Sequence, residues 1–208
     1  MVSAGGVRVS ARRAGTAGPG TGNDSDDGDW IKGREKLNRE PDSLHLQSYM
    51  PACLYTFGYE GFDVASFIAR LKTVGITAIV DVRKLPLSRK KGFSKTALGS
   101  HLKDAGIGYF HAPALGCPKA IRNRYREDGN WLAYTRDFRD YLETQEATVR
   151  QIAKFAQSST VCLICFEADF NFCHRTYVAR ATMRAGGLQV QHITAKTVFP
   201  DQPVRLAA

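Results

Sequence analysis

Hydrophobic and polar positions follow two different periods along residues 52–193. Short, nearly continuous apolar runs are typical of buried parallel strands, whereas apolar residues three or four apart are typical of helices that cover one face of a sheet. The continuous runs predict strands at 52–57, 76–82, 107–111, 160–166 and 188–193. The helical spacing predicts helices at 62–75, 94–105, 131–144, 146–157 and 173–185.

Local signals at the ends of these segments support the same division. Asp63 and Asn130 are typical N-cap residues, and Gly75 is a typical helix stop. Residues 112–129 carry Pro, Gly and many basic groups without a clear period, so we expect a long loop there. Strands that alternate with helices predict a single three-layer, doubly wound α/β domain over 51–200, with about five mainly parallel strands.

Composition places the rest of the chain. The 208 residues are 43% hydrophobic, which suits one sizeable core. Residues 1–50 are rich in Gly, Ser, Asp and Arg and predict a disordered tail, and 201–208 form a short C-terminal tail. The sequence has no secretory or membrane-spanning apolar run, so we expect a cytoplasmic protein with no membrane partner. Five cysteines, an odd number, indicate reduced thiols rather than a disulfide framework.

Chemically versatile residues follow the predicted strands. Ligands of doubly wound sheets bind beyond the carboxyl ends of the strands, so these residues are expected to meet in one crevice. The stretches are "GYEG" after the first strand, "DVRKLPLSRKK" after the second, "HAPALG" after the third and "CFEADFNFCHR" after the fourth.

These stretches, with a later "FRDYLET", resemble the domain-of-unknown-function family numbered 488 over nearly all of residues 53–193. The resemblance implies an α/β fold and a shared site, but no particular reaction. The motifs that carry it are Gly58-Tyr59-Glu60, Asp81-Val82-Arg83, Cys165-Phe166-Glu167-Ala168-Asp169 and Cys173-His174-Arg175.

An anion site is our first expectation for the crevice. Arg83, Arg175 and the N–H groups of the helix that starts near Cys173 are suited to phosphate, and the net charge of +9 attracts anions. With Glu167 as general acid or base, these residues predict an enzyme that acts on a phosphorylated small molecule, a nucleotide or a nucleic acid. The alternative is that Arg83 only pairs with Glu167 or Asp169.

Four further residues are substrate-binding candidates. Tyr59 can stack on a ligand or fill the rim of the core, and Asp81 belongs to the same motif as Arg83. His111 can act as a base or simply cover the sheet edge. Asp169 would share a strand face with Glu167 if the strand continued that far, but a helix-capping or ion-pairing role is favoured for it.

Two thiols support a different chemistry. Cys165 or Cys173, with His174 beside them, can act as the nucleophile of a sulfurtransferase-like or redox enzyme, and "IVDVR" resembles a rhodanese strand. The loop between Cys165 and Arg175 is longer than the anion-wrapping loop of those enzymes and holds two acids. Both features weaken the match.

Two more alternatives complete the set. Cys165, Glu167, Cys173 and His174 are all competent metal ligands, but their spacing is unlike that of zinc fingers, and adjacent Cys and His are hard to bring to one ion. We therefore expect no resident cofactor, with a bound metal as the lesser alternative. The basic, aromatic segment from Lys119 to Trp131 suits a non-catalytic nucleic-acid-binding module or is simply a solvated loop.

Overall fold

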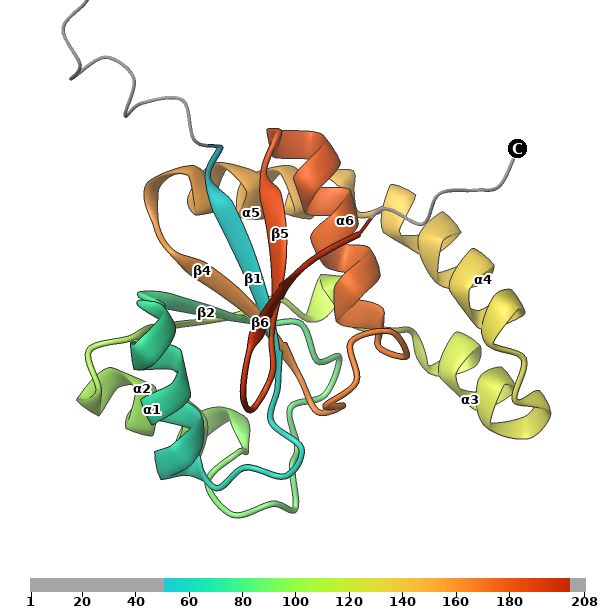
Figure 1. The fold of residues 1–208 in the computed structure, drawn as a ribbon. Coiled ribbons are helices and arrows are strands. Elements are labelled where there is room, and N and C mark those ends of the chain that lie inside the picture. The colour runs from blue at the N-terminus through green and yellow to red at the C-terminus, as the bar shows by residue number, and fades with distance from the viewer. Residues whose placement is uncertain (1–50, 203–208) are drawn as a thin grey trace, which may run out of the picture. The chain divides into compact units, whose positions relative to one another are not determined.

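A computed structural model describes residues 51–202 of the chain, so the predicted tail at 1–50 and most of the one at 201–208 lie outside this range. Asp201, placed in the C-terminal tail by the sequence, belongs to the domain, because its N–H donates to the Val190 carbonyl and its carboxylate pairs with Arg180. The described part is built from six strands and six α-helices (Figure 1). In chain order they are β1 (Cys53–Gly58), α1 (Val64–Val74), β2 (Ala78–Asp81), α2 (Lys95–Asp104), β3 (Gly108–His111), α3 (Lys119–Asp128), α4 (Trp131–Glu143), α5 (Glu146–Ser158), β4 (Val161–Cys165), α6 (His174–Gly186), β5 (Gln189–Ile193) and β6 (Val198–Pro200).

The strands form one sheet in the order β3-β2-β4-β1-β5-β6. The first five are parallel, and β6 runs antiparallel to β5 at the edge. The mainly parallel α/β fold is therefore confirmed, with one strand more than the five expected. Because β6 has three residues, ends at Pro200 and is paired on one side only, it leaves no recognisable alternation in the sequence.

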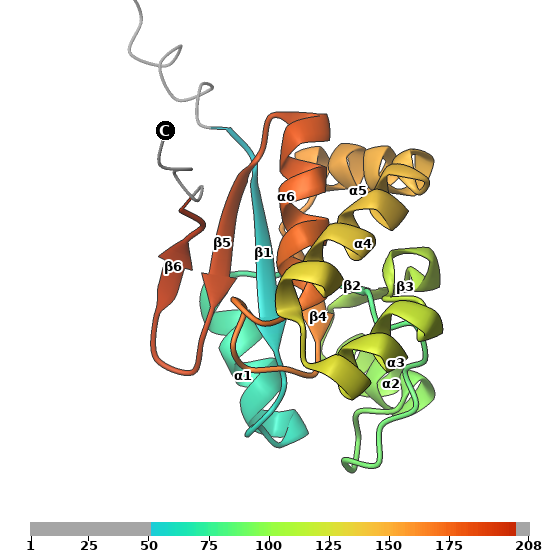
Figure 2. The same ribbon diagram turned by 90° about the vertical axis from the view of Figure 1, so that its right-hand side faces the viewer.

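Helices cover both faces of the sheet, which gives the three layers (Figure 2). On one face α1 and α2 pack onto the strands through buried residues such as Phe67 and Leu102. On the other face α4, α5 and α6 contribute Phe138, Ile152 and Val178 to a second cluster. A sheet covered on both sides needs apolar residues on both sides of its strands, which explains the continuous apolar runs of β2 and β4.

The prediction of a long loop at 112–129 is wrong. This segment contains a short 3-10 helix at Pro113–Leu115 and the ten-residue helix α3. None of the residues of α3 is buried, and its partly buried Ile121 and Tyr125 are too few apolar positions to show a period among the charged residues around them. The signal that remained was Gly129, which ends α3 in the left-handed conformation.

Strand β4 ends at Cys165, and this end shapes the candidate site. The next residues leave the strand and are held by the turn after β1, where the N–H groups of Tyr59 and Glu60 donate to the carbonyls of Cys165 and Phe166. Glu167 and Asp169 therefore do not share a strand face, which required the strand to continue through them. No helix among residues 51–202 is long and apolar enough to cross a membrane.

Candidate functional site

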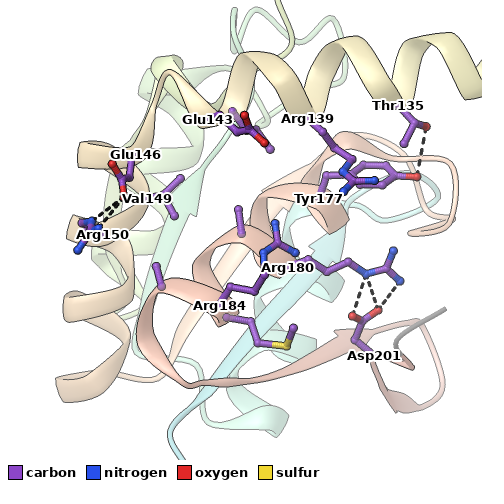
Figure 3. A pocket seen from close by; sticks show the side chains of 14 residues that line it. Thr135, Arg139, Glu143, Glu146, Val149, Arg150, Tyr177, Arg180, Arg184 and Asp201 are labelled. Carbon is purple, nitrogen blue, oxygen red and sulfur yellow. Dashed lines mark hydrogen bonds and ion pairs between the residues drawn. The ribbon is translucent and has the colours of Figure 1, made fainter. Parts of the chain in front are cut away.

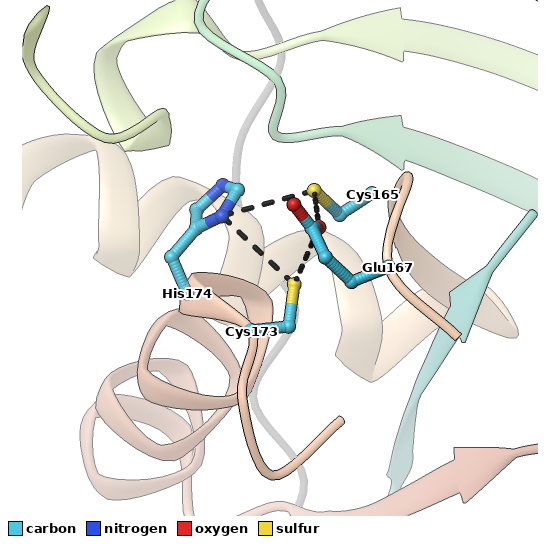
Figure 4. Close-up of side chains that lie close together, drawn as sticks. All are labelled: Cys165, Glu167, Cys173 and His174. Atoms are coloured by element: carbon cyan, nitrogen blue, oxygen red, sulfur yellow. Dashed lines mark hydrogen bonds between the residues drawn. The ribbon is translucent and has the colours of Figure 1, made fainter. Parts of the chain in front are cut away.

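Four side chains from the end of β4 and the start of α6 point toward one another (Figure 4). The thiols of Cys165 and Cys173 both donate to Oε2 of Glu167, at 2.7 and 3.2 Å. Nδ1 of His174 lies 3.7 Å from the Cys165 sulfur and 3.9 Å from the Cys173 sulfur. One ligand atom from each residue falls within 4.8 Å of every other. We call these four residues the cysteine cluster.

The orientation of His174 is fixed by a main-chain group. Its Nε2 lies 3.0 Å from the carbonyl oxygen of Val82 at the end of β2. A carbonyl oxygen can only accept, so Nε2 carries a proton, and Nδ1 faces the two sulfurs, as an acceptor when the ring is neutral and as a donor when it is protonated. Phe138 packs edge-on against the ring from α4. The ring is therefore positioned by groups outside the cluster.

Crowding of ionisable groups shifts their pKa values. Burial and the charge of Cys173 raise the pKa of Glu167. The hydrogen bond shared with Cys173, together with burial, raises the pKa of Cys165. For Cys173, burial opposes ionisation, but the contacts with Cys165, Arg175 and His174 prevail and hold its pKa well below the ordinary value. The cluster thus keeps protons among groups that would otherwise repel one another.

The loop that carries Glu167 is held firmly by its main chain. Arg175 is fully buried and donates to the carbonyls of Glu167 and Ala168, and Oε2 of Glu60 accepts from the N–H of Ala168 at 2.9 Å. A Cβ atom on Gly58 would lie only 1.8 Å from the Glu167 carbonyl oxygen, so only glycine allows this close approach. The guanidinium of Arg175 thus holds the loop rather than facing the crevice.

Arg83 belongs to a separate buried network at the end of β2. Its guanidinium is paired with Asp81 at 2.5 Å, and Nη1 donates to the hydroxyl of Tyr59 and to the carbonyl of Phe93. Tyr109 donates to the same Asp81 carboxylate at 2.6 Å. The expected alternative pairing of Arg83 with Glu167 or Asp169 is wrong, because Asp81 is its partner. We call Tyr59, Asp81, Arg83 and Tyr109 the arginine network.

The remaining site candidates have local partners. His111 lies with Nε2 3.0 Å from the Arg83 carbonyl, on the edge strand. Asp169 is exposed and accepts from the main chain and side chain of Asn171, so it neither caps α6 nor contacts Glu167. Cys162 is fully buried in β4, and burial raises its pKa, as expected for a packing residue.

A larger hollow lies elsewhere, between α4, α5 and α6 (Figure 3). It measures about 1000 Å³ and includes Arg139, Tyr177 and Arg184, but none of the four cluster residues lines it. Arg150 and Arg180 on its wall are paired with Glu146 and Asp201. Its size alone does not connect it with the ionisable groups described above.

Comparison with known families decides the relationship of the chain. The family described as "Domain of unknown function DUF488" matches residues 63–182, more than half of the chain. The chain belongs to the DUF488 family. No curated protein and no solved structure matched it. The DUF488 match includes all four residues of the cysteine cluster. It also includes the arginine network, apart from Tyr59.

Cys173 and His174 lie close enough to share one ligand, although the sequence analysis expected adjacent residues not to do so. Cys173 and His174 are adjacent, yet both reach the same point, because Cys173 is the extended N-cap residue of α6 and His174 is its first helical residue. The change of backbone conformation between them brings the two side chains to one side. Glu60 was overlooked as a site residue, although its motif was recognised.

Proposed function

We propose that this DUF488 chain is a metalloprotein whose cysteine cluster binds one thiophilic divalent metal ion, with Zn²⁺ as the first candidate. Two sulfurs, one imidazole nitrogen and one carboxylate oxygen are a ligand set that zinc accepts. The ion would lie at the carboxyl ends of the strands, where doubly wound folds bind their ligands.

A single observation carries this proposal, namely the distance from His174 Nδ1 to the two sulfurs. In a tetrahedral zinc site with ordinary bond lengths, a sulfur and a nitrogen ligand are about 3.6 Å apart. The corresponding distances in the cysteine cluster are 3.7 and 3.9 Å. The Val82 carbonyl behind His174 is the outer partner that metal-bound imidazoles usually have.

Metal content and cobalt spectroscopy test the proposal. The full chain, purified without chelator, is expected to contain about one zinc per chain by elemental analysis. Replacement by Co²⁺ should give intense visible bands of a tetrahedral ion and a near-ultraviolet sulfur-to-cobalt band. Cys173→Ser should abolish the stoichiometric binding, whereas Cys53→Ser, at a cysteine outside the cluster, should retain it. A wild-type chain that gives no such bands would overturn the proposal.

A thiol redox function is the second candidate, supported by one feature. The sulfurs of Cys165 and Cys173 lie 2.7 and 3.2 Å from one Glu167 oxygen, and the surroundings of Cys173 hold its pKa well below the ordinary value. In such a reaction the two thiols would be oxidised to a disulfide while a disulfide such as oxidised glutathione is reduced to two thiols. Loss of two alkylatable thiols from the metal-free chain on this treatment, mapped to Cys165 and Cys173, would favour it over metal binding.

The phosphate hypothesis stays a prediction and receives less support. It relied on Arg83 and Arg175, and both guanidinium groups are buried: Arg83 is occupied by protein acceptors, and both terminal nitrogens of Arg175 donate to carbonyls, which leaves only its buried Nε without a partner. The nucleic-acid alternative is weakened in a similar way, because Tyr125 and Trp131 pack against each other and Arg124 pairs with Asp137. The sulfur-rich cluster therefore takes first place.

A further inference from the structure

The four residues of the cysteine cluster are not equally accessible. Cys165, Cys173 and His174 are 4, 1 and 8% exposed, whereas Glu167 is partly exposed. The residue before Glu167, Phe166, is 43% exposed. Glu167 is therefore the side of the cluster nearest to solvent, whereas the other three residues are buried.

The carboxylate also fits the metal geometry less well than the other groups. A carboxylate oxygen and a sulfur bound to one tetrahedral zinc ion would be about 3.6 Å apart. Oε2 of Glu167 lies 2.7 and 3.2 Å from the two sulfurs, which is hydrogen-bonding distance. Metal binding removes the thiol protons on which these hydrogen bonds depend. The carboxylate must then move outward by roughly 0.4 to 0.9 Å to bind the ion, or further to leave it.

Only the side chain of Glu167 lacks an anchor. The imidazole of His174 is held by Val82, Cys165 lies on a buried strand, and Cys173 lies at the start of a helix. The main chain of Glu167 is fixed by Arg175, but among the described residues the carboxylate accepts from no side chain other than the two thiols, besides a contact with its own N–H. Once the contacts with the thiols are lost, no other side chain among the described residues holds the carboxylate.

We infer that the metal centre has three permanent ligands, Cys165, Cys173 and His174, and a fourth position that Glu167 and a small anion from solution occupy in turn. This inference rests on the proposed metal binding. Exchange breaks the bond between the metal and the carboxylate oxygen and forms one between the metal and the incoming anion, and the carboxylate stays ionised beside it. Such a position is typical of catalytic zinc sites, whereas structural sites are closed by four protein ligands. Glu167 would then be next to the bound ligand, in reach of a proton on it.

Azide binding to the cobalt-substituted chain tests the inference. Azide should change the visible cobalt spectrum in a saturable manner and leave the sulfur-to-cobalt band in place. Glu167→Ala should retain cobalt and bind azide about tenfold more tightly, because no carboxylate competes for the position. Glu167→Gln, which keeps the shape of the side chain, should have the same direction of effect. Asp169→Asn, a carboxylate in the same loop without contact to the cluster, should behave as wild type.

Each failure has its own signature. A sulfur-to-cobalt band with a visible cobalt spectrum that azide does not change, together with a hundredfold loss of cobalt affinity in both Glu167 variants, would show a closed four-ligand site and overturn the exchangeable position alone. Absence of the sulfur-to-cobalt band from the wild-type chain would overturn the metal centre itself.

Discussion

The arginine network and the cysteine cluster lie at the ends of neighbouring strands and are both buried, but their polar atoms are balanced differently. In the arginine network donors and acceptors match: the Arg83 guanidinium donates to Asp81, Tyr59 and a carbonyl, and Tyr109 fills the second carboxylate oxygen. In the cysteine cluster four groups with lone pairs face one another. Their lone pairs would repel one another without the protons that lie between them in hydrogen bonds.

The difference indicates different roles. A buried ion pair whose hydrogen bonds are all made within the protein has no capacity left for a ligand, and removal of one partner leaves an unpaired charge. A set of four converging lone-pair donors can exchange its shared protons for a cation, because metal ligands must be deprotonated. The first arrangement therefore holds the strand ends in place, and the second is where we place the function.

The largest expected effect is that of breaking the arginine network. Asp81→Ala should lower the free energy of unfolding by about 4 kcal/mol, because it leaves the Arg83 charge buried and removes the acceptor of Tyr109. Urea denaturation of the metal-free chain measures this loss. The double variant Asp81→Leu, Arg83→Met, in which both charges are gone, should recover much of it. Equal stability of the single and double variants would contradict the role given to the pair.

The next effect is smaller and arises at the close contact between Gly58, which precedes Tyr59 of the arginine network, and the main chain of Glu167 in the cysteine cluster. Gly58→Ala should lower the free energy of unfolding by about 3 kcal/mol, because the added methyl group meets the Glu167 carbonyl at 1.8 Å. The displaced loop should also weaken cobalt binding. Gly99→Ala is the matched control, since its nearest atom is 3.5 Å away in Tyr109 and the site is inside α2. It should be neutral or slightly stabilising.

The sequence was sufficient for the parts of the fold that leave a periodic trace. The side chains of Asp63 and Asn130 cap α1 and α4 as expected, and the continuous apolar strands identify the covered sheet. Helix α3 and strand β6 were missed, since one buries no residue and the other is too short for a period. Periodicity reports burial, so exposed elements escape it.

The site was predicted in part, for a similar reason. All four residues of the cysteine cluster were named as candidates because motifs place them after β4, which fixes their neighbourhood. The partners of Arg83 and Arg175 were not predictable, since several of them are main-chain carbonyls, a kind of acceptor that every residue offers. Whether a guanidinium faces a ligand or a carbonyl depends on loop paths that no local pattern encodes.

A third buried network, formed by Arg180, His192 and Asp201 near the β5–β6 edge of the sheet, allows a prediction about pH. Asp201 accepts from Arg180 at 2.8 and 2.9 Å and lies 3.1 Å from Nε2 of His192. Although burial raises the pKa of Asp201, the hydrogen bonds of His192 and Arg180 prevail and lower it from 3.8 to about 2. A lowered folded-state pKa means that the stabilisation is complete above about pH 4 and is lost as the pH falls toward 2.

The expected contribution of this network is about 2 kcal/mol at pH 5. Urea denaturation of the wild-type chain and of Asp201→Asn should therefore differ by about this amount at pH 5 and much less near pH 2. Asp169→Asn provides the comparison for an exposed carboxylate and should show little difference at either pH. A gap between wild type and Asp201→Asn that persists at pH 2 would contradict the assigned cause.

The smallest expected effect comes from Glu60, which lies outside the cysteine cluster and holds the main chain of the loop that carries Glu167. Glu60→Ala removes the acceptor of the Ala168 N–H in an exposed part of the loop and should lower the free energy of unfolding by about 1 kcal/mol. Because the main chain of Glu167 keeps its contact with Arg175, cobalt should still bind, with an affinity reduced by about tenfold. Glu60→Gln retains an acceptor oxygen and should restore most of the affinity. If Glu60→Ala instead abolished cobalt binding, the carboxylate of Glu60 would have to be counted among the ligands, and the division between a supporting loop and a four-residue cluster would not hold.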